Sequence, residues 1–128
     1  MEVKKTIMAI IAAGSTYLFG VTDSFFIAFI VFVIIDFITG VLGAIFQKKL
    51  SSDVGVKGII RKVGLFALLA IAHITDSVFG LGGVVRSTII LFLISNEALS
   101  VLENLSKMGI IIPKKLQDVL AQIKKTNE

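Results

Sequence analysis

Apolar residues gather in long runs along this chain, and most charged residues lie between those runs. A helix needs about 20 mainly apolar residues to cross a hydrocarbon layer about 30 Å thick. Four segments approach or meet this length: 6–22, 24–46, 63–80 and 84–105. The pattern therefore predicts an all-α integral membrane protein with about four transmembrane helices.

The two longest segments differ in how strongly they favour insertion. Segment 24–46 holds 16 Ile, Leu, Val or Phe residues, which together favour insertion by about 7 kcal/mol against about 3 kcal/mol for Asp36. Segment 84–105 holds 12 such residues, and one buried Glu removes more than half of their contribution of about 5 kcal/mol. Segment 84–105 therefore needs helical partners inside the membrane.

The C-terminal segment 113–124 has a different period. Leu116, Val119, Leu120 and Ile123 recur at helical spacing among polar residues. Pro113 suits the first position of a helix because that position needs no N–H donor. This tail is predicted to be a short amphipathic helix that lies on the membrane surface or on a neighbouring helix.

The first apolar segment has a second interpretation. Lys4 and Lys5 precede it, and Ala12, Ala13 and Gly14 provide small residues, so it also has features of a cleavable signal peptide. The next segment starts only two residues after the first one ends. This short connection favours a tight helical hairpin.

Composition narrows the class. The 128 residues fit one domain, 1–128, and 55% of them are hydrophobic against 17% charged. The chain has no cysteine, which excludes disulfides and thiolate metal sites. The net charge is +4, but the sequence predicts no soluble surface on which the basic residues could gather, so we expect no nucleic acid partner. We interpret the basic residues instead as setting the orientation of the chain in the membrane.

The basic residues predict the orientation in the membrane. Five of the 13 basic residues fall in the stretch 47–62, which we interpret as a hinge between two apolar halves; these topology-setting residues are Lys48, Lys49, Lys57, Arg61 and Lys62. With four spans and both termini in the cytoplasm, every basic residue except Arg86 lies on the cytoplasmic side, as the positive-inside rule requires.

Polar residues within the spans form two stripes at helical spacing. One stripe contains Asp36, Gly40 and Gly43, and the other contains Glu97, Ser100 and Asn104. A charge near mid-bilayer costs at least about 2.5 kcal/mol, so such residues are first read as functional. We interpret these stripes as an oligomer-facing or pore-facing surface, with interhelical bonding that only fixes the packing as the alternative.

Other candidate residues lie near the outer ends of the last two spans. Asp76 and Arg86 flank the short turn at 81–83, and we expect them to form an ion pair. His73 is the only histidine and has no companion ligands for a metal. No nucleophile motif or phosphate-binding loop occurs, so the sequence predicts neither an enzyme nor a cofactor.

Several short motifs in order resemble one family, the toxin-secretion and phage-lysis holins of Gram-positive bacteria and their phages. They run from Asp36 to Ile123 and comprise 36–42 (DFITGVL), 48–52 (KKLSS), 58–62 (GIIRK), 86–88 (RST), 96–100 (NEALS), 103–104 (EN), 108–109 (MG) and 113–116 (PKKL).

The resemblance implies a multi-pass protein of the bacterial cytoplasmic membrane that accumulates harmlessly and then oligomerises with itself into lesions. The implied partners are membrane lipid and an antiholin. The implied cargo is an endolysin or a protein toxin. The resemblance supplies no catalytic residue. Met8 could act as a second start, because a chain beginning there would lack Lys4 and Lys5.

Two other classes stay open. In a small multimeric ion channel or transporter subunit, Asp36 and Glu97 would form a selectivity ring. A structural membrane partner or antiholin would oligomerise without permeabilising the membrane. Release of a folded cytoplasmic protein separates a holin from both.

Overall fold

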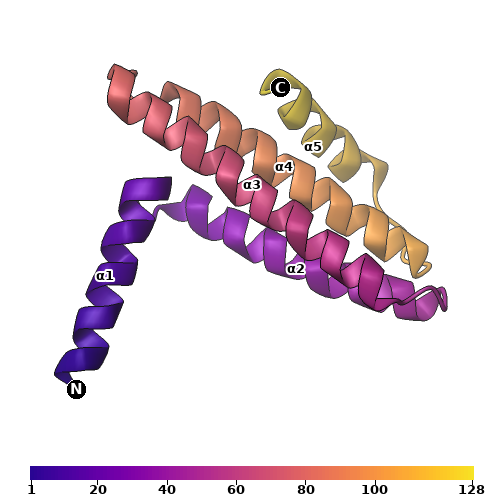
Figure 1. Ribbon diagram of the computed structural model, residues 1–128. Helices are drawn as coiled ribbons and strands as arrows, with labels where there is room; N and C mark the ends of the chain where they lie inside the picture. The colour runs from indigo at the N-terminus through magenta and orange to yellow at the C-terminus, as the bar shows by residue number, and fades with distance from the viewer.

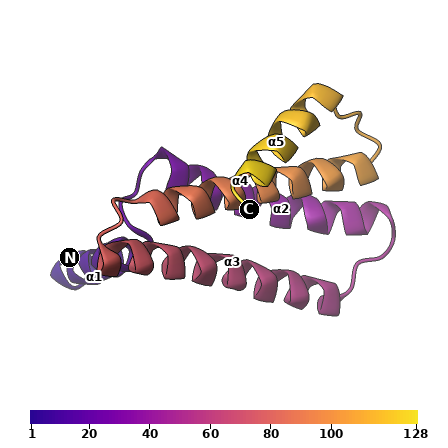
Figure 2. The same ribbon diagram turned by 90° about the horizontal axis from the view of Figure 1, so that it is seen from above.

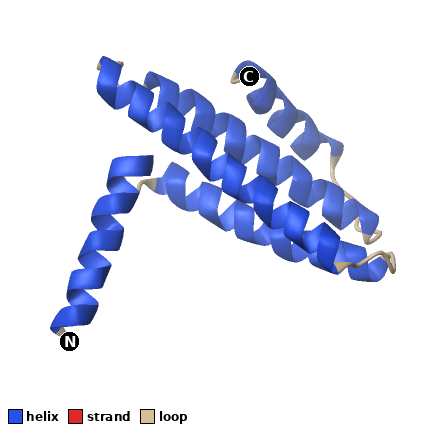
Figure 3. Ribbon diagram, viewed as in Figure 1, coloured by secondary structure: helices blue, strands red, loops and turns tan.

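Five helices make up the chain in the computed structural model, which describes residues 1–128 (Figure 3). They are α1 (Glu2–Phe19), α2 (Ser24–Phe46), α3 (Ser52–Phe79), α4 (Val84–Lys107) and α5 (Lys114–Thr126). Helices α2, α3 and α4 run up and down beside one another, and α4 contacts α2 most extensively (Figure 1). The predicted all-α class is confirmed.

Helix α3 begins earlier than the apolar pattern predicts. Ser51 has extended backbone dihedral angles, and its hydroxyl accepts a hydrogen bond from the N–H of Val54 at 3.2 Å, so it caps a helix that starts at Ser52. Most of the stretch 47–62 is therefore helical, and only residues 47–51 connect α2 to α3. The expectation of a basic hinge is wrong, because good N-cap chemistry outweighs the lower hydropathy of these residues.

The core is small and apolar. It consists of side chains from α2, α3 and α4, namely Phe26, Phe29, Val33, Leu69, Ile90 and Leu93. Only 16 of the 128 residues are buried, whereas large apolar side chains of α2 such as Phe25, Ile34 and Ile38 are about half exposed. A water-soluble bundle of this size would hide such residues, so this exterior suits contact with lipid.

Two helices are long and apolar enough to cross a membrane, α2 and α4. This result and the apolar exterior fit the expected helical membrane protein. The four predicted spans and the cytoplasmic placement of both termini stay predictions.

Helix α1 leaves the bundle at a steep angle (Figures 1 and 2). Its C-terminal end touches the other helices through Phe19, whose ring stacks on Phe26 at 5.4 Å and meets the edge of Phe66 at 5.7 Å between centroids. The expected tight hairpin of the first two segments is therefore wrong. The cause lies in the connection 20–23, which Arg86 binds through several hydrogen bonds described below.

Helix α5 folds back along α4 (Figures 1 and 2). The reversal takes place in residues 108–113, where Gly109 has a φ of +82°, a conformation that favours glycine. The predicted amphipathic tail is thus a helix, and of its two expected locations the structure shows the neighbouring helix.

Candidate functional site

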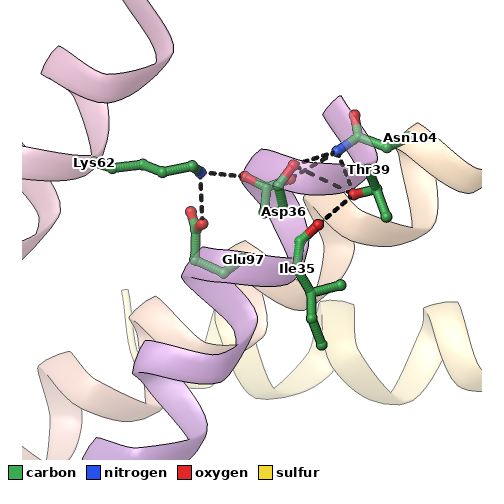
Figure 4. Close-up of polar contacts among 6 residues, drawn as sticks. All are labelled: Ile35, Asp36, Thr39, Lys62, Glu97 and Asn104. Carbon is green, nitrogen blue, oxygen red and sulfur yellow. Dashed lines mark hydrogen bonds and ion pairs between the residues drawn. The ribbon is translucent and has the colours of Figure 1, made fainter. Parts of the chain in front are cut away.

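Four polar side chains meet inside the bundle, and we call them the lysine cluster: Asp36 of α2, Lys62 of α3, and Glu97 and Asn104 of α4 (Figure 4). The Nζ atom of Lys62 lies 2.5 Å from a carboxylate oxygen of Asp36 and 3.0 Å from one of Glu97. The amide of Asn104 donates to Asp36 at 2.8 Å and to the hydroxyl of Thr39 at 3.0 Å. Three helices are therefore joined by one charged centre.

The three charged residues lie at the same level because of their helix positions. Asp36 and Glu97 each stand ten residues before the last residue of their helix, and Lys62 stands ten residues after the first residue of α3. At 1.5 Å per residue each is about 15 Å from the same end of the bundle. In a hydrocarbon layer about 30 Å thick that begins at this end of the bundle, the cluster would lie near the middle.

Small residues allow this close approach of α2 and α4. A Cβ atom added to Gly40 would lie 3.6 Å from the Asn104 amide nitrogen, and one added to Gly43 would lie 3.6 Å from the Asn104 carbonyl oxygen. Both distances are ordinary van der Waals contacts, and only the neighbour of Gly43 belongs to the α4 backbone. The two glycines therefore leave room for a close approach in which Asn104 reaches Asp36.

The lysine cluster contains more acidic groups than basic groups. One lysine faces two carboxylates, and the exposed fractions of the side chains are 16% for Lys62, 9% for Asp36 and 4% for Glu97. Burial strengthens the attraction between opposite charges but penalises any charge left uncompensated. When all three groups are ionised, the cluster keeps one excess negative charge, and contact with water or another cation would stabilise it.

A second polar group, which we call the arginine cluster, ties α1, α2 and α4 together. The Arg86 guanidinium lies 3.0 Å from the Asp23 carboxylate and donates hydrogen bonds to the carbonyl oxygens of Phe19 at 2.6 Å and Val21 at 3.0 Å. Gly20 permits this arrangement, because an added Cβ would lie 2.7 Å from Nε of Arg86. Arg86 therefore fixes the direction in which α1 leaves the bundle.

The expected ion pair between Asp76 and Arg86 is wrong, although the two residues are neighbours. The carboxylate of Asp76 accepts a hydrogen bond from the backbone N–H of Arg86. Because Gly83 at the start of α4 has no side chain to cap the helix, the first N–H groups, which have no acceptor within the helix, need one from elsewhere. Asp76 supplies it from α3, which leaves the guanidinium free to bind Asp23.

Asp23 has two roles in this cluster. It caps α2 by accepting a hydrogen bond from the N–H of Phe26 at 2.9 Å, and it pairs with Arg86. The hydrogen bond from Arg86 is the largest influence and holds the pKa of the Asp23 carboxyl below its ordinary value, while partial burial acts in the opposite direction. The charged form of Asp23 is therefore the one that stabilises the fold.

The predicted stripes face inward in this structure. Asp36 and Glu97 are buried and Asn104 is half-buried, all between helices of one chain, whereas Ser100 is half-buried without a hydrogen bond to the cluster. Whether they also form an oligomer or pore face stays a prediction. Of the topology-setting residues, Lys48, Lys49, Lys57 and Arg61 are exposed, and Lys62 alone turns into the bundle.

Sequence reasoning missed Lys62 and Asp23 as partners of the buried charges. For Lys62 the signal was the cap at Ser51, since counting α3 from there places Lys62 at the level of Asp36 and Glu97. For Asp23 it was the position of an N-cap residue directly before a long apolar run.

The site offers no evident catalytic chemistry. No group of three His, Asp or Glu side chains converges in a way that could hold a metal ion. His73 lies against Gly20 at the outer side of the arginine cluster. What the arrangement does is hold paired charges between the helices.

The apolar exterior and the two candidate spans indicate a helical membrane protein. The profile of the bacteriophage holin family matches residues 13–125. The chain therefore belongs to this family, which is not an enzyme family.

One of the similar proteins is itself named a probable holin. A probable holin of Bacillus phage phi105 is 39% identical over 95 residues, which cover 74% of this chain and 70% of that protein. YqxH of Bacillus subtilis, an uncharacterised protein, is 40% identical over 95 residues, 74% of this chain and 68% of its own. An uncharacterised protein of Listeria monocytogenes is 36% identical over 104 residues, 81% of this chain and 74% of its own. No solved structure matches.

Proposed function

We propose that this protein is a holin that accumulates in the bacterial cytoplasmic membrane and then oligomerises into lesions. An endolysin or a protein toxin leaves the cytoplasm through these lesions, and an antiholin regulates their timing. Family membership and the probable phage holin support the holin role. The lesion, its cargo and the partners are the parts that need experiment.

The lysine cluster is the observation that carries the proposal. Within one chain, Lys62 satisfies Asp36 and Glu97 at mid-level, so a single copy can stay in the membrane without exposing charge to lipid. This explains harmless accumulation. A chain with unpaired charges at that depth would insert poorly.

The lysine cluster also favours exchange of its contacts within one chain for contacts in an oligomer. Its excess negative charge is better stabilised by water than by the interior of a dry bundle. At high density, α4 of one copy can pack against another copy and turn its polar stripe toward a shared water-filled space, as polar helix faces do when helices associate in membranes. The lesion is then lined by residues that are hidden in the single copy.

The proposed topology keeps four spans with both termini in the cytoplasm. It places the exposed basic residues Lys48, Lys49, Lys57 and Arg61 on the cytoplasmic side and Arg86 on the outer side. In this arrangement α1 enters the membrane as a separate helix, since it makes few contacts with the bundle.

The proposal is tested by inducible expression in a bacterium with two simultaneous readouts. These are membrane potential and release of a cytoplasmic reporter enzyme of about endolysin size. We expect a delay, then abrupt loss of potential together with release of the reporter. Loss of potential without release would instead indicate a small channel, and no effect would indicate an antiholin or structural partner.

A further inference from the structure

Helix α5 packs on α4 with only part of its apolar side. The residues of α5 and the following turn that are partly shielded are Leu120, Lys124 and Asn127, which share one face at steps of four and three. The apolar stripe Leu116, Val119 and Ile123 is turned aside and remains 37–49% exposed. An amphipathic helix docked for stability alone would bury this stripe.

In the docked position, lysine side chains of α5 lie far along α4, which would place them deep in the membrane if α4 spans it. The Nζ atom of Lys124 lies 5.8 Å from the centre of the Phe92 ring. Phe92 stands 15 residues before the last residue of α4, Lys107, which is about 22 Å along the helix. If α4 spans the membrane, Lys124 and the exposed Lys125 would lie near or beyond mid-bilayer, where each lysine is strongly disfavoured.

We infer that α5 has two exclusive positions, docked on α4 outside lipid and bound to an anionic bilayer surface once α4 spans the membrane. This inference rests on the proposed function only in that α4 is a transmembrane helix. In the second position Leu116, Val119 and Ile123 enter the boundary of the acyl chains. The connection through Gly109 provides the pivot.

Charge complementarity identifies the occupant as an anionic lipid surface. Helix α5 carries Lys114, Lys115, Lys124 and Lys125 against one acid, Asp118. Basic residues near a membrane attract anionic headgroups, and an exposed apolar stripe inserts beside them. A hollow of about 420 Å³ separates α4 from α5. Departure of α5 would open this hollow and expose its α4 side, which includes Leu99, Leu102 and Glu103.

The test uses single cysteines, which are unambiguous because the chain has none. Ile123→Cys and its neighbour Gln122→Cys carry an environment-sensitive fluorophore in vesicles of phosphatidylcholine with or without phosphatidylglycerol. Spin-labelled lipids place quenchers at shallow or deep positions. Dye leakage from the same vesicles is recorded separately, so a failure to permeabilise does not count as a failure of α5 to bind.

With phosphatidylglycerol present, we expect shallow quenching at position 123 to exceed that at position 122 several-fold, and the difference to shrink without the anionic lipid. Equal exposure of both positions to water in the anionic vesicles would overturn the inference. Predominantly deep quenching at both positions would also overturn it, because α5 would then remain along α4 inside the bilayer.

Discussion

Lys62 shows how one side chain joins sequence, packing and function. It belongs to a basic stretch whose other members are exposed, yet it turns inward and binds both Asp36 and Glu97. A buried carboxylate without a cation is strongly unfavourable, so Lys62 is the residue that makes the bundle tolerable in lipid. The expectation that it only sets topology is therefore incomplete.

Replacing Lys62 with methionine keeps the unbranched apolar stem of the side chain but removes the charged amino group. Two buried carboxylates then lack a cation, and we expect the free energy of unfolding to fall by about 3–5 kcal/mol. Unfolding in micelles, followed by circular dichroism, measures this loss. Lys57→Met is the matched control, because Lys57 is 71% exposed and pairs only with Asp53; equal effects of the two changes would contradict the role of Lys62.

Asp23 predicts a dependence of stability on pH. Its pKa is lowered in the folded protein, so its contribution is present above the unfolded pKa of about 3.9 and is lost as pH falls through the folded value. We expect the melting temperature of the wild type to exceed that of Asp23→Asn near neutral pH, and the gap to close under acid conditions. A gap that stays constant or widens on acidification would show that Asp23 does not act through its charge.

At the scale of elements, capping and connections decide where the helices begin and where they point. Ser51 starts α3 early, Asp76 caps α4 from a neighbouring helix, and Arg86 holds the connection between α1 and α2. These contacts explain why the arginine cluster lies at one end of the bundle, whereas the lysine cluster lies near its middle. They also explain why α1 stands apart.

Gly20 is the sensitive point of that connection. Its φ is +86°, and an alanine Cβ would lie 2.7 Å from Arg86 Nε, so we expect Gly20→Ala to destabilise the protein by about 1–3 kcal/mol. Thermal unfolding in micelles provides the measurement. Gly14→Ala is the control with the opposite sign: nothing lies within 4 Å of its added Cβ, and alanine within a helix stabilises by about 0.5–1 kcal/mol. A neutral Gly20→Ala would contradict the contact.

The pattern of apolar runs predicted the helices α2 and α4 well, because long runs of Ile, Leu, Val and Phe permit few alternatives. It singled out Asp36, Glu97 and Asn104, which the structure places between helices, but not the residues that they pair with. Periodicity places residues on one face of one helix, whereas the pairing of Lys62 and the choice of Asp23 by Arg86 depend on where three helices meet. The direction of α1 depends on hydrogen bonds between distant segments, which no local pattern contains.

At the scale of the whole molecule, the protein is a thin bundle with charges inside and apolar side chains outside. Such a molecule is stable in lipid only while its charges remain paired, and one lysine for two carboxylates leaves that pairing incomplete. In the mechanism that we propose, the single copy and the oligomer are two ways of satisfying the same charged groups. This mechanism predicts a delay followed by abrupt permeabilisation.

Glu97→Gln tests whether the excess negative charge of the lysine cluster drives permeabilisation. Glutamine retains an oxygen that can accept from Lys62, and the cluster becomes one cation with one anion. We therefore expect the variant to accumulate normally but to permeabilise the membrane later than the wild type, or not at all. Glu103→Gln on the same helix is the control, because Glu103 is 68% exposed and its only ion pair is with Lys107 at 3.6 Å. Unchanged timing for Glu97→Gln would show that the excess charge is irrelevant.

The most direct measurement of the central claim is cross-linking between copies at Ser100, which lies on α4 between Glu97 and Asn104. Ser100, the site of the Ser100→Cys variant, is half-buried within one chain. Ser87→Cys is the control, because Ser87 is an exposed residue of α4. Cells are sampled with a thiol oxidant before and after loss of membrane potential. We predict that disulfide-linked dimers through position 100 appear only when the membrane becomes permeable, with no such timing at position 87. Permeabilisation without any dimer at position 100, or dimers there long before it, would contradict the exchange of partners in the lysine cluster.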